Sequence, residues 1–369
     1  MFTPALFRNA TLTIAMTVMS GQAALADTYM PSCYIPAKGI ETTVSYEGRE
    51  GPYRIALVNG HTGIPWREQM IKTTRAWAKR PENAKNIAEL NVVSTGGDVA
   101  AQIAAIDNFI QAGYDAVVFI AVNPTAFQAV ITRAERAGTV LVSFDNPVDS
   151  ERVLRITPEW TEFEGEIKTQ SVVNQMEKPE GKVLIVRGIQ GNSTDRDRQV
   201  GVARVLANYP GIETVEVVGN WDTGTVQKVT TDAIAVHEHF DAFICQHGCR
   251  GVTNAIAATG HPIVPVGGDA ENGFVLGLVR NHIPGISVST SPGQGPIALR
   301  AAIALLQGET LPSTVNLPTP YVETADMVEG VNYFPDQPDT FETVTGYAVC
   351  GEDMVLSPDE INAQTIDNN

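Results

Sequence analysis

The chain has 369 residues, of which 43% are hydrophobic, and a formal net charge of −17. That length fits two domains, each with a core of its own, better than one very large domain. Such an acidic chain is poorly suited to binding nucleic acid, so we expect no nucleic-acid partner.

The first 26 residues have the pattern of a secretory signal peptide. Arg8 precedes an apolar stretch at 10–19, and Ala24-Leu25-Ala26 is a small-x-small cleavage signal. The apolar stretch is too short for a convincing membrane span. We therefore expect residues 1–26 to be removed on export; the alternative is a disordered cytoplasmic N-terminus. Residues 27–52 are expected to form an irregular extension.

Short apolar strands then alternate with amphipathic helices. The first unit has strands predicted at 53–58, 89–94, 114–121 and 140–144, and helices at 67–79, 100–112 and 125–137. The second unit has helices predicted at 162–176, 195–209, 225–237, 251–259, 273–281 and 295–307, and strands at 182–187, 214–218, 241–245, 262–266 and 286–290. The alternation predicts an α/β protein with two parallel sheets, each covered by helices on both faces. Region 309–369 is expected to cross between the two units and end as an extended tail.

Four cysteines occur in the chain, and an even count in an exported protein suggests two disulfides with three possible connectivities. A Cys33–Cys350 bond would tie both terminal extensions to the body, and Cys245–Cys249 would close a tight loop. The alternative is a metal site using Cys245, Cys249 and either His247 or His261. Zinc sites usually have two-residue spacers and a second ligand pair, which this sequence lacks.

The loop 191–198, between a predicted strand and a predicted helix, carries Arg196 and Arg198. An arginine beside a helix N-terminus can donate hydrogen bonds to a small polar ligand. Both arginines could equally be solvated or paired with Asp195 and Asp197. On a helical wheel the two arginines flank opposite borders of the apolar stripe, so geometry does not choose between them.

Further polar and aromatic residues directly follow predicted parallel strands, where open sheets bind their ligands. Each has a structural explanation as a cap, a turn or a packing anchor. Their shared position at one edge of two sheets favours a binding site. They are His61, Trp66, Asn123, Asp145, Trp221, His247 and Asp269.

From Tyr53 to about Thr319 the chain resembles the periplasmic ribose-type sugar-binding proteins, the type I solute-binding proteins of ABC importers. The resemblance rests on an ordered series of stretches: 53–67 with Pro65-Trp66, 115–125 ending in Asn-Pro-Thr, 140–145, 188–201, 241–247, 264–269 and 287–292. It implies two doubly wound parallel-sheet lobes joined by a three-strand hinge, with crossings near Thr157, Thr290 and 318–321. The N-terminal lobe would be 53–156 plus 291–318, the C-terminal lobe 157–290 plus 319–345, and the tail 346–369.

The resemblance also implies the ligand residues. The positions that match the family pattern are Trp66, Asn123, Asp145, Arg196, Trp221 and Asp269, with Arg198 left to surface or ion-pair chemistry. Several positions depart from the pattern: Ile64 replaces an asparagine, Arg67 an aromatic, Asn146 an arginine, His247 an asparagine and Thr290 a glutamine. The stretch Glu159-Trp160 is one residue out of register with the family, so either Glu159 or Trp160 could reach the cleft. Arg67 could face the cleft or the solvent.

The expected function is capture of a monosaccharide or polyol and its delivery to an inner-membrane ABC permease with its ATPase. Alternatives are a ligand-presenting sensor for a membrane receptor and a binder of a sugar acid. Asp145, His247 and Asp269 could support acid–base chemistry, but the sequence has no nucleophile elbow, phosphate loop or metal signature. We therefore expect a monomeric binding protein that has no cofactor and no catalytic residues.

Overall fold

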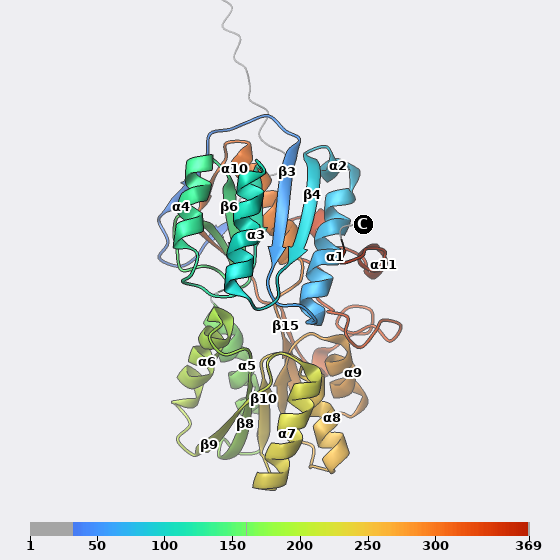
Figure 1. Cartoon of the computed structure of the whole chain (residues 1–369). Coiled ribbons are helices and arrows are strands. Elements are labelled where there is room, and N and C mark those ends of the chain that lie inside the picture. The colour runs from blue at the N-terminus through green and yellow to red at the C-terminus, as the bar shows by residue number, and fades with distance from the viewer. Residues whose placement is uncertain (1–31, 160, 368–369) are drawn as a thin grey trace, which may run out of the picture.

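The computed structural model describes residues 32–159 and 161–367. The predicted signal peptide and Trp160 lie outside the described residues. Two α/β lobes lie one above the other (Figure 1), and we call them the N-lobe and the C-lobe. Within the described part of the chain, no helix is both long enough and apolar enough to cross a membrane.

The N-lobe is built on a seven-stranded sheet in the order β1-β14-β7-β6-β5-β3-β4. Its strands are β1 (Ile35–Pro36), β3 (Tyr53–Asn59), β4 (Ile87–Ser94), β5 (Ala116–Phe119), β6 (Val140–Phe144), β7 (Leu154–Pro158) and β14 (Thr314–Leu317). All neighbours are parallel except β1 and β14. The accompanying helices are α1 (Pro65–Lys79), α2 (Pro81–Ala84), α3 (Val99–Gln111), α4 (Gln128–Ala137) and α10 (Gln294–Leu306). Every residue of α10 is buried, which makes this helix part of the N-lobe core.

The C-lobe repeats this construction on a six-stranded sheet in the order β15-β12-β11-β10-β8-β9. Its strands are β8 (Gly181–Arg187), β9 (Ile212–Val218), β10 (Ala242–Cys245), β11 (Val266–Gly268), β12 (Gly285–Val288) and β15 (Tyr321–Glu323), the last one antiparallel. The helices are α5 (Thr161–Gln175), α6 (Ser193–Leu206), α7 (Thr223–His237), α8 (Arg250–Thr259) and α9 (Asn272–Arg280).

Both sheets reverse their strand order at the same point. In the N-lobe β3 lies between β4 and β5, and in the C-lobe β8 lies between β9 and β10. Such a switch point leaves a crevice outside the carboxyl ends of the strands, where ligands bind. The chain passes between the sheets after β7, after β12 and between β14 and β15.

Two expectations about the ends of the chain were wrong. The N-terminal extension is not wholly irregular, because β1 pairs with β14, and β2 (Thr43–Ser45) pairs with β13 (Thr310–Pro312). The C-terminal region is not an extended tail. It forms the short helices η1 (Thr324–Asp326), η2 (Ala348–Cys350), η3 (Glu352–Met354) and α11 (Pro358–Asn362). Beyond residue 346 it packs on the N-lobe, where Tyr347, Met354 and Ile361 join the hydrophobic core.

Candidate ligand-binding site

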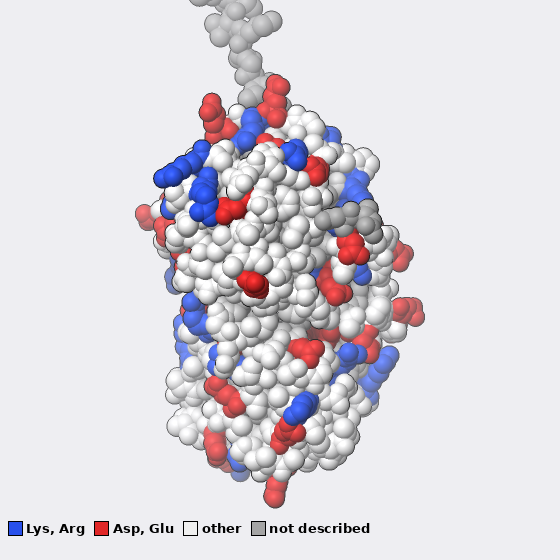
Figure 2. Space-filling model, viewed as in Figure 1, with Lys and Arg blue, Asp and Glu red and all other residues white. Residues whose placement is uncertain are grey.

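A cavity lies between the two lobes. Residues from both sheets' carboxyl-end loops and from the hinge line it: Ile64, Trp66, Arg67, Asp145, Asn146, Thr194, Arg198, Trp221, His247, Ser289 and Thr290. On the face of the molecule shown in Figure 2, basic and acidic side chains are interspersed.

Arg67 and Asp145 form an ion pair on the N-lobe side of the cavity. Arg67 lies in the first turn of α1, is only 3% exposed and faces the cleft. Its Nη2 is 3.2 Å from Oδ2 of Asp145, and the Asn146 amide donates to the same oxygen at 2.8 Å. Asp145 has a positive φ of 60°, a conformation that Asp tolerates and that occurs at constrained sites. Burial raises the pKa of Asp145, and the nearby Arg67 and Arg198 cations partly offset the rise.

Arg198 reaches the cavity from the C-lobe. Its Nη2 lies 2.5 Å from Oε2 of Glu164 on α5, and Lys168 Nζ lies 3.1 Å from the other oxygen of Glu164. Helices α5 and α6 approach closely because both carry glycine at the crossing: a Cβ on Gly165 would lie 2.0 Å from the Arg198 carbonyl oxygen. This close packing brings Arg198 against Glu164 and holds it toward the cavity.

Two tryptophans bring apolar surface to the cavity. Trp66 donates its indole N–H to the Thr290 carbonyl at 2.7 Å, which joins α1 to the hinge. Trp221 donates to Oε1 of Gln246 at 3.2 Å and has a positive φ of 58°. Both indoles therefore keep their N–H groups bonded to protein while their ring faces remain available to a ligand.

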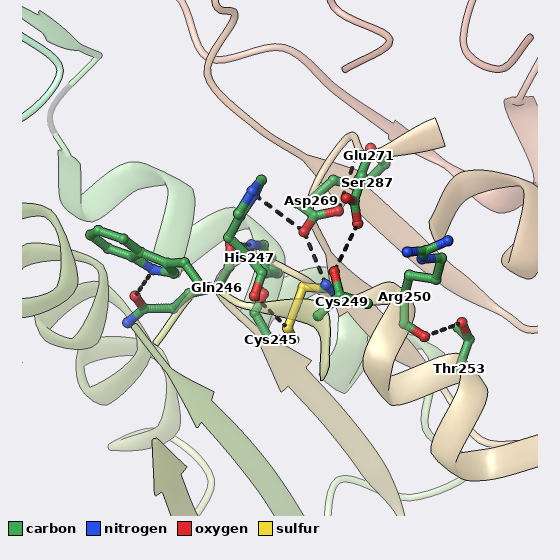
Figure 3. The surroundings of a disulfide bond; sticks show 12 residues. Cys245, Gln246, His247, Cys249, Arg250, Thr253, Asp269, Glu271 and Ser287 are labelled. Carbon is green, nitrogen blue, oxygen red and sulfur yellow. Dashed lines mark hydrogen bonds and ion pairs between the residues drawn. A yellow bond between two sulfur atoms is a disulfide. The ribbon is translucent and has the colours of Figure 1, made fainter. Parts of the chain in front are cut away.

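His247 is held in a short loop closed by the Cys245–Cys249 disulfide (Figure 3). Its Nδ1 lies 3.2 Å from Oδ2 of Asp269. Asp269 is completely buried and also accepts hydrogen bonds from the backbone N–H groups of Cys249 and Glu271. Burial lowers the pKa of His247, and the Asp269 carboxylate only partly opposes this, so the ring is neutral near pH 7.

Seven of the expected ligand residues line the cavity: Trp66, Arg67, Asp145, Asn146, Trp221, His247 and Thr290. Asp269 does not line it but lies behind His247 and orients the imidazole. Asn123 is also off the cavity wall. Its side-chain oxygen accepts from the backbone N–H and the hydroxyl of Thr125, so it stabilises a turn.

Of the two loop arginines, Arg198 lines the cavity, whereas Arg196, which the resemblance favoured, does not. The side chain of Arg196 is 55% exposed and pairs with Asp197. Arg198 is two residues further along α6, roughly 200° around the helix axis, and it points into the cavity. The helical wheel places Arg196 and Arg198 on opposite edges of the apolar stripe of α6. Which edge faces the cleft depends on where α5 packs against α6.

Ile64, the position that departs from the family's asparagine, also lines the cavity. Two further lining residues, Thr194 and Ser289, were not expected from the sequence, although Ser289 directly precedes the expected Thr290. Both predicted disulfides, Cys33–Cys350 and Cys245–Cys249, are present. Among the described residues, no group of three or more His, Cys, Asp or Glu side chains could hold a metal ion.

Two α/β lobes with a polar cavity at their switch points define a two-lobed solute-binding protein. The family model described as periplasmic binding protein domain matches residues 55–310, and the chain belongs to this family of exported periplasmic solute-binding proteins, which are not enzymes.

Individual relatives are similar over most of the matched region. A protein of Rhizobium meliloti named as a candidate rhizopine-binding protein is 27% identical over 257 residues, covering 65% of this chain and 82% of the relative. The xylitol-binding protein of Mycolicibacterium smegmatis is 26% identical and covers 61% of this chain and 66% of its own length. The crystal structure of an ABC transporter solute-binding protein from Thermobispora bispora superposes with a TM-score of 0.70 at 29% identity, covering 74% of this chain and 86% of that one.

Proposed function

We propose that this protein captures a neutral monosaccharide or polyol between its lobes and delivers it to an inner-membrane ABC permease with its ATPase. One observation carries the ligand class. Four cavity residues each have a buried polar atom with no hydrogen-bond partner among the described residues: Arg67 Nη1, Asn146 Oδ1, Arg198 Nε and His247 Nε2. Leaving such an atom unpaired costs about 1–3 kcal/mol. A polyol presents several hydroxyls that both donate and accept, so it can satisfy donors and acceptors together.

The charges around the cavity support a neutral ligand. Arg67 pairs with Asp145, Arg198 and Lys168 both pair with Glu164, and Asp269 lies beside the neutral His247 ring. Three buried cations therefore stand beside three buried carboxylates. Burial raises the pKa of Glu271 to about 8 and that of Glu342 well above its ordinary value, so these two acids add little charge at neutral pH. The carboxylate of a sugar acid would add one negative charge that no buried cation is left to neutralise.

The tryptophans support a ligand with an apolar face. Trp66 and Trp221 are each 6% exposed and line the same cavity. The C–H faces of a sugar ring or cyclitol can pack on indole rings, while the hydroxyls at the ring edge meet the arginines and Asp145. This combination suits a ring of monosaccharide size.

Calorimetric titration with D-ribose, xylitol, myo-inositol and D-glucuronate tests the ligand class. We expect at least one neutral compound to bind, and a ligand at 100 times its dissociation constant to add about 2.7 kcal/mol to the stability. If D-glucuronate is the only compound of the four that binds, the ligand class is a sugar acid and not a neutral sugar or polyol. Binding of none of the four would contradict the proposal.

Delivery to a permease rests on the family and has its own test. We expect deletion of the gene to abolish uptake of the radiolabelled ligand by intact cells. Uptake that persists while a transcriptional response to the ligand is lost would favour the sensor alternative. Sedimentation of the purified protein should give the mass of a monomer with and without ligand.

A further inference from the structure

The C-terminal segment crosses between the lobes a fourth time, outside the stretch matched by the family. We call residues 339–347 the C-terminal strap. On the C-lobe, the Thr343 N–H donates to the Ala270 carbonyl at 3.0 Å. At the other end, Tyr347 packs in the N-lobe core, and its hydroxyl accepts from the Ser291 N–H at 3.1 Å. Figure 1 shows this segment, near the red end of the colour range, passing from the C-lobe toward α11.

Glu342 lies in the strap where both lobes meet it. Its backbone forms an isolated antiparallel bridge with Glu271 of the C-lobe. The side-chain amide of Gln69 on α1 both accepts from the Glu342 N–H and donates to its carbonyl, each at 2.8 Å. The backbone of Glu342 is therefore fixed from two sides, and its side chain has a defined direction.

That direction is toward His247, a residue of the cavity wall, and Glu342 lies behind this wall. Oε1 of Glu342 lies 3.7 Å from Nε2 of His247, and the His247 ring lines the cavity. The Glu342 side chain is completely buried. Both of its carboxyl oxygens and Nε2 of His247 have no hydrogen-bond partner within the described part of the chain.

The spacing of these atoms suits a bridging hydroxyl group. A separation of 3.7 Å is too long for a direct hydrogen bond, but an oxygen placed about 2.8 Å from each atom would bond to both. Each buried polar atom left unpaired costs about 1–3 kcal/mol, so filling this position is favourable.

We propose that Glu342 and His247 together bind one hydroxyl group of the ligand, so that the C-terminal strap forms part of the binding site. This inference rests on the proposed function and identifies a ligand residue outside the family match. The Asp269 carboxylate beside Nδ1 places the ring proton there, which leaves Nε2 of His247 as an acceptor. The ligand hydroxyl donates to Nε2 and accepts from a protonated Glu342.

The surroundings of Glu342 agree with a protonated carboxyl group. Burial raises its pKa, and Asp269, Glu271 and Glu164 raise it further, while Arg198 opposes them. A neutral acid is a hydrogen-bond donor as well as an acceptor. Glutamine has the same shape and also offers a donor and an acceptor, whereas methionine fills the space with neither.

The test is a titration series with Glu342→Met and Glu342→Gln. Wild type is first titrated with D-ribose, xylitol and myo-inositol, and the tightest of these is then compared with its single-deoxy analogues. We expect Glu342→Met to bind the parent compound about 10-fold more weakly, the size of one buried hydrogen bond. For one deoxy analogue, the one that lacks the bridging hydroxyl, wild type and Glu342→Met should bind equally. Glu342→Gln should stay within about 3-fold of wild type.

Glu329→Gln is the matched control, because Glu329 is an exposed acid of the same C-terminal region. Circular dichroism and urea unfolding verify that each variant is folded. Unchanged affinity of Glu342→Met, or an equal loss for the parent and every deoxy analogue, would overturn the inference while leaving the proposed function intact. If wild type binds none of the three compounds, the proposed function fails and this inference with it.

Discussion

Arg198 shows at the scale of one residue how burial turns a charge into a binding group. Its partner Glu164 is 1% exposed and is also paired with Lys168, which is 2% exposed. Buried charges of this kind are costly unless each is paired. Glu164 therefore fixes the direction of the Arg198 guanidinium and leaves its Nε without a partner among the described residues, where we expect the ligand to bond.

Substituting Arg198 should abolish most of the binding. We expect Arg198→Met to weaken ligand affinity by about 10- to 100-fold, because hydrogen bonds from a charged donor are worth about 1.5–3 kcal/mol each. Titration calorimetry measures the loss. Arg196→Met is the matched control, and its affinity should equal that of wild type because Arg196 pairs with Asp197 on the surface. Normal binding by Arg198→Met, or weak binding by Arg196→Met, would reverse the assignment.

The two arginines also show what the sequence could predict about the site. Strand ends placed Asp145, His247 and Trp221 at one edge of two sheets, because position along a strand determines the edge at which a residue lies. The same argument could not choose between Arg196 and Arg198, since that choice depends on where α5 packs. Asp269 and Asn123 were expected to contact ligand because side chains that cap or orient neighbours have the same residue types as those that bind.

At the scale of elements, the two disulfides constrain very different lengths of chain. Cys33–Cys350 joins residues 317 apart and anchors the C-terminal segment on the N-lobe. Cys245–Cys249 spans four positions and shapes the loop that carries His247. Loop-closure entropy grows with the length of the loop, so the two bonds should matter for different properties.

Removing each disulfide should separate stability from binding. Chain entropy predicts that losing Cys33–Cys350 costs roughly 4 kcal/mol more than losing Cys245–Cys249. We expect the Cys33→Ser/Cys350→Ser variant to melt at a clearly lower temperature but to bind ligand when folded. The Cys245→Ser/Cys249→Ser variant should melt near wild type and bind more weakly, because His247 loses its fixed position. Calorimetric scans and titrations of both variants provide the comparison, and the opposite pattern would contradict it.

Elements could be predicted where their patterns were local. Alternating apolar strands and amphipathic helices identified both sheets, since buried parallel strands are apolar throughout. The strand expected at 262–266 was placed too early: β11 begins at Val266, because Pro262 and Pro265 lack the N–H groups that a central strand needs. The C-terminal strap has no periodic pattern, and its position depends on contacts with both lobes that only the folded chain reveals.

At the scale of the whole molecule, the strap brings acidic groups together where it joins the lobes. Asp269, Glu271 and Glu342 are each at most 1% exposed. Burial, followed by the Asp269 charge, raises the pKa of Glu271 from its ordinary value of 4.5 to about 8. The folded protein therefore retains a proton that the unfolded chain releases, and this couples folding to pH.

The contribution of Glu271 to stability should consequently fall as the pH rises from about 4.5 to about 8. The contribution of Glu271 is complete below the unfolded-state pKa of 4.5 and is lost as the pH passes through the folded-state pKa of about 8. Each pH unit in that window removes up to about 1.4 kcal/mol. Urea unfolding of wild type at several pH values from 4.5 to 9 measures the slope. Glu271→Gln cannot ionise, so it should match wild type near pH 4.5, exceed it by a few kcal/mol near pH 9, and show a shallower slope. Glu329→Gln, which changes an exposed acid, should keep the wild-type slope. An identical slope in wild type and Glu271→Gln would show that Glu271 does not retain its proton in the folded protein.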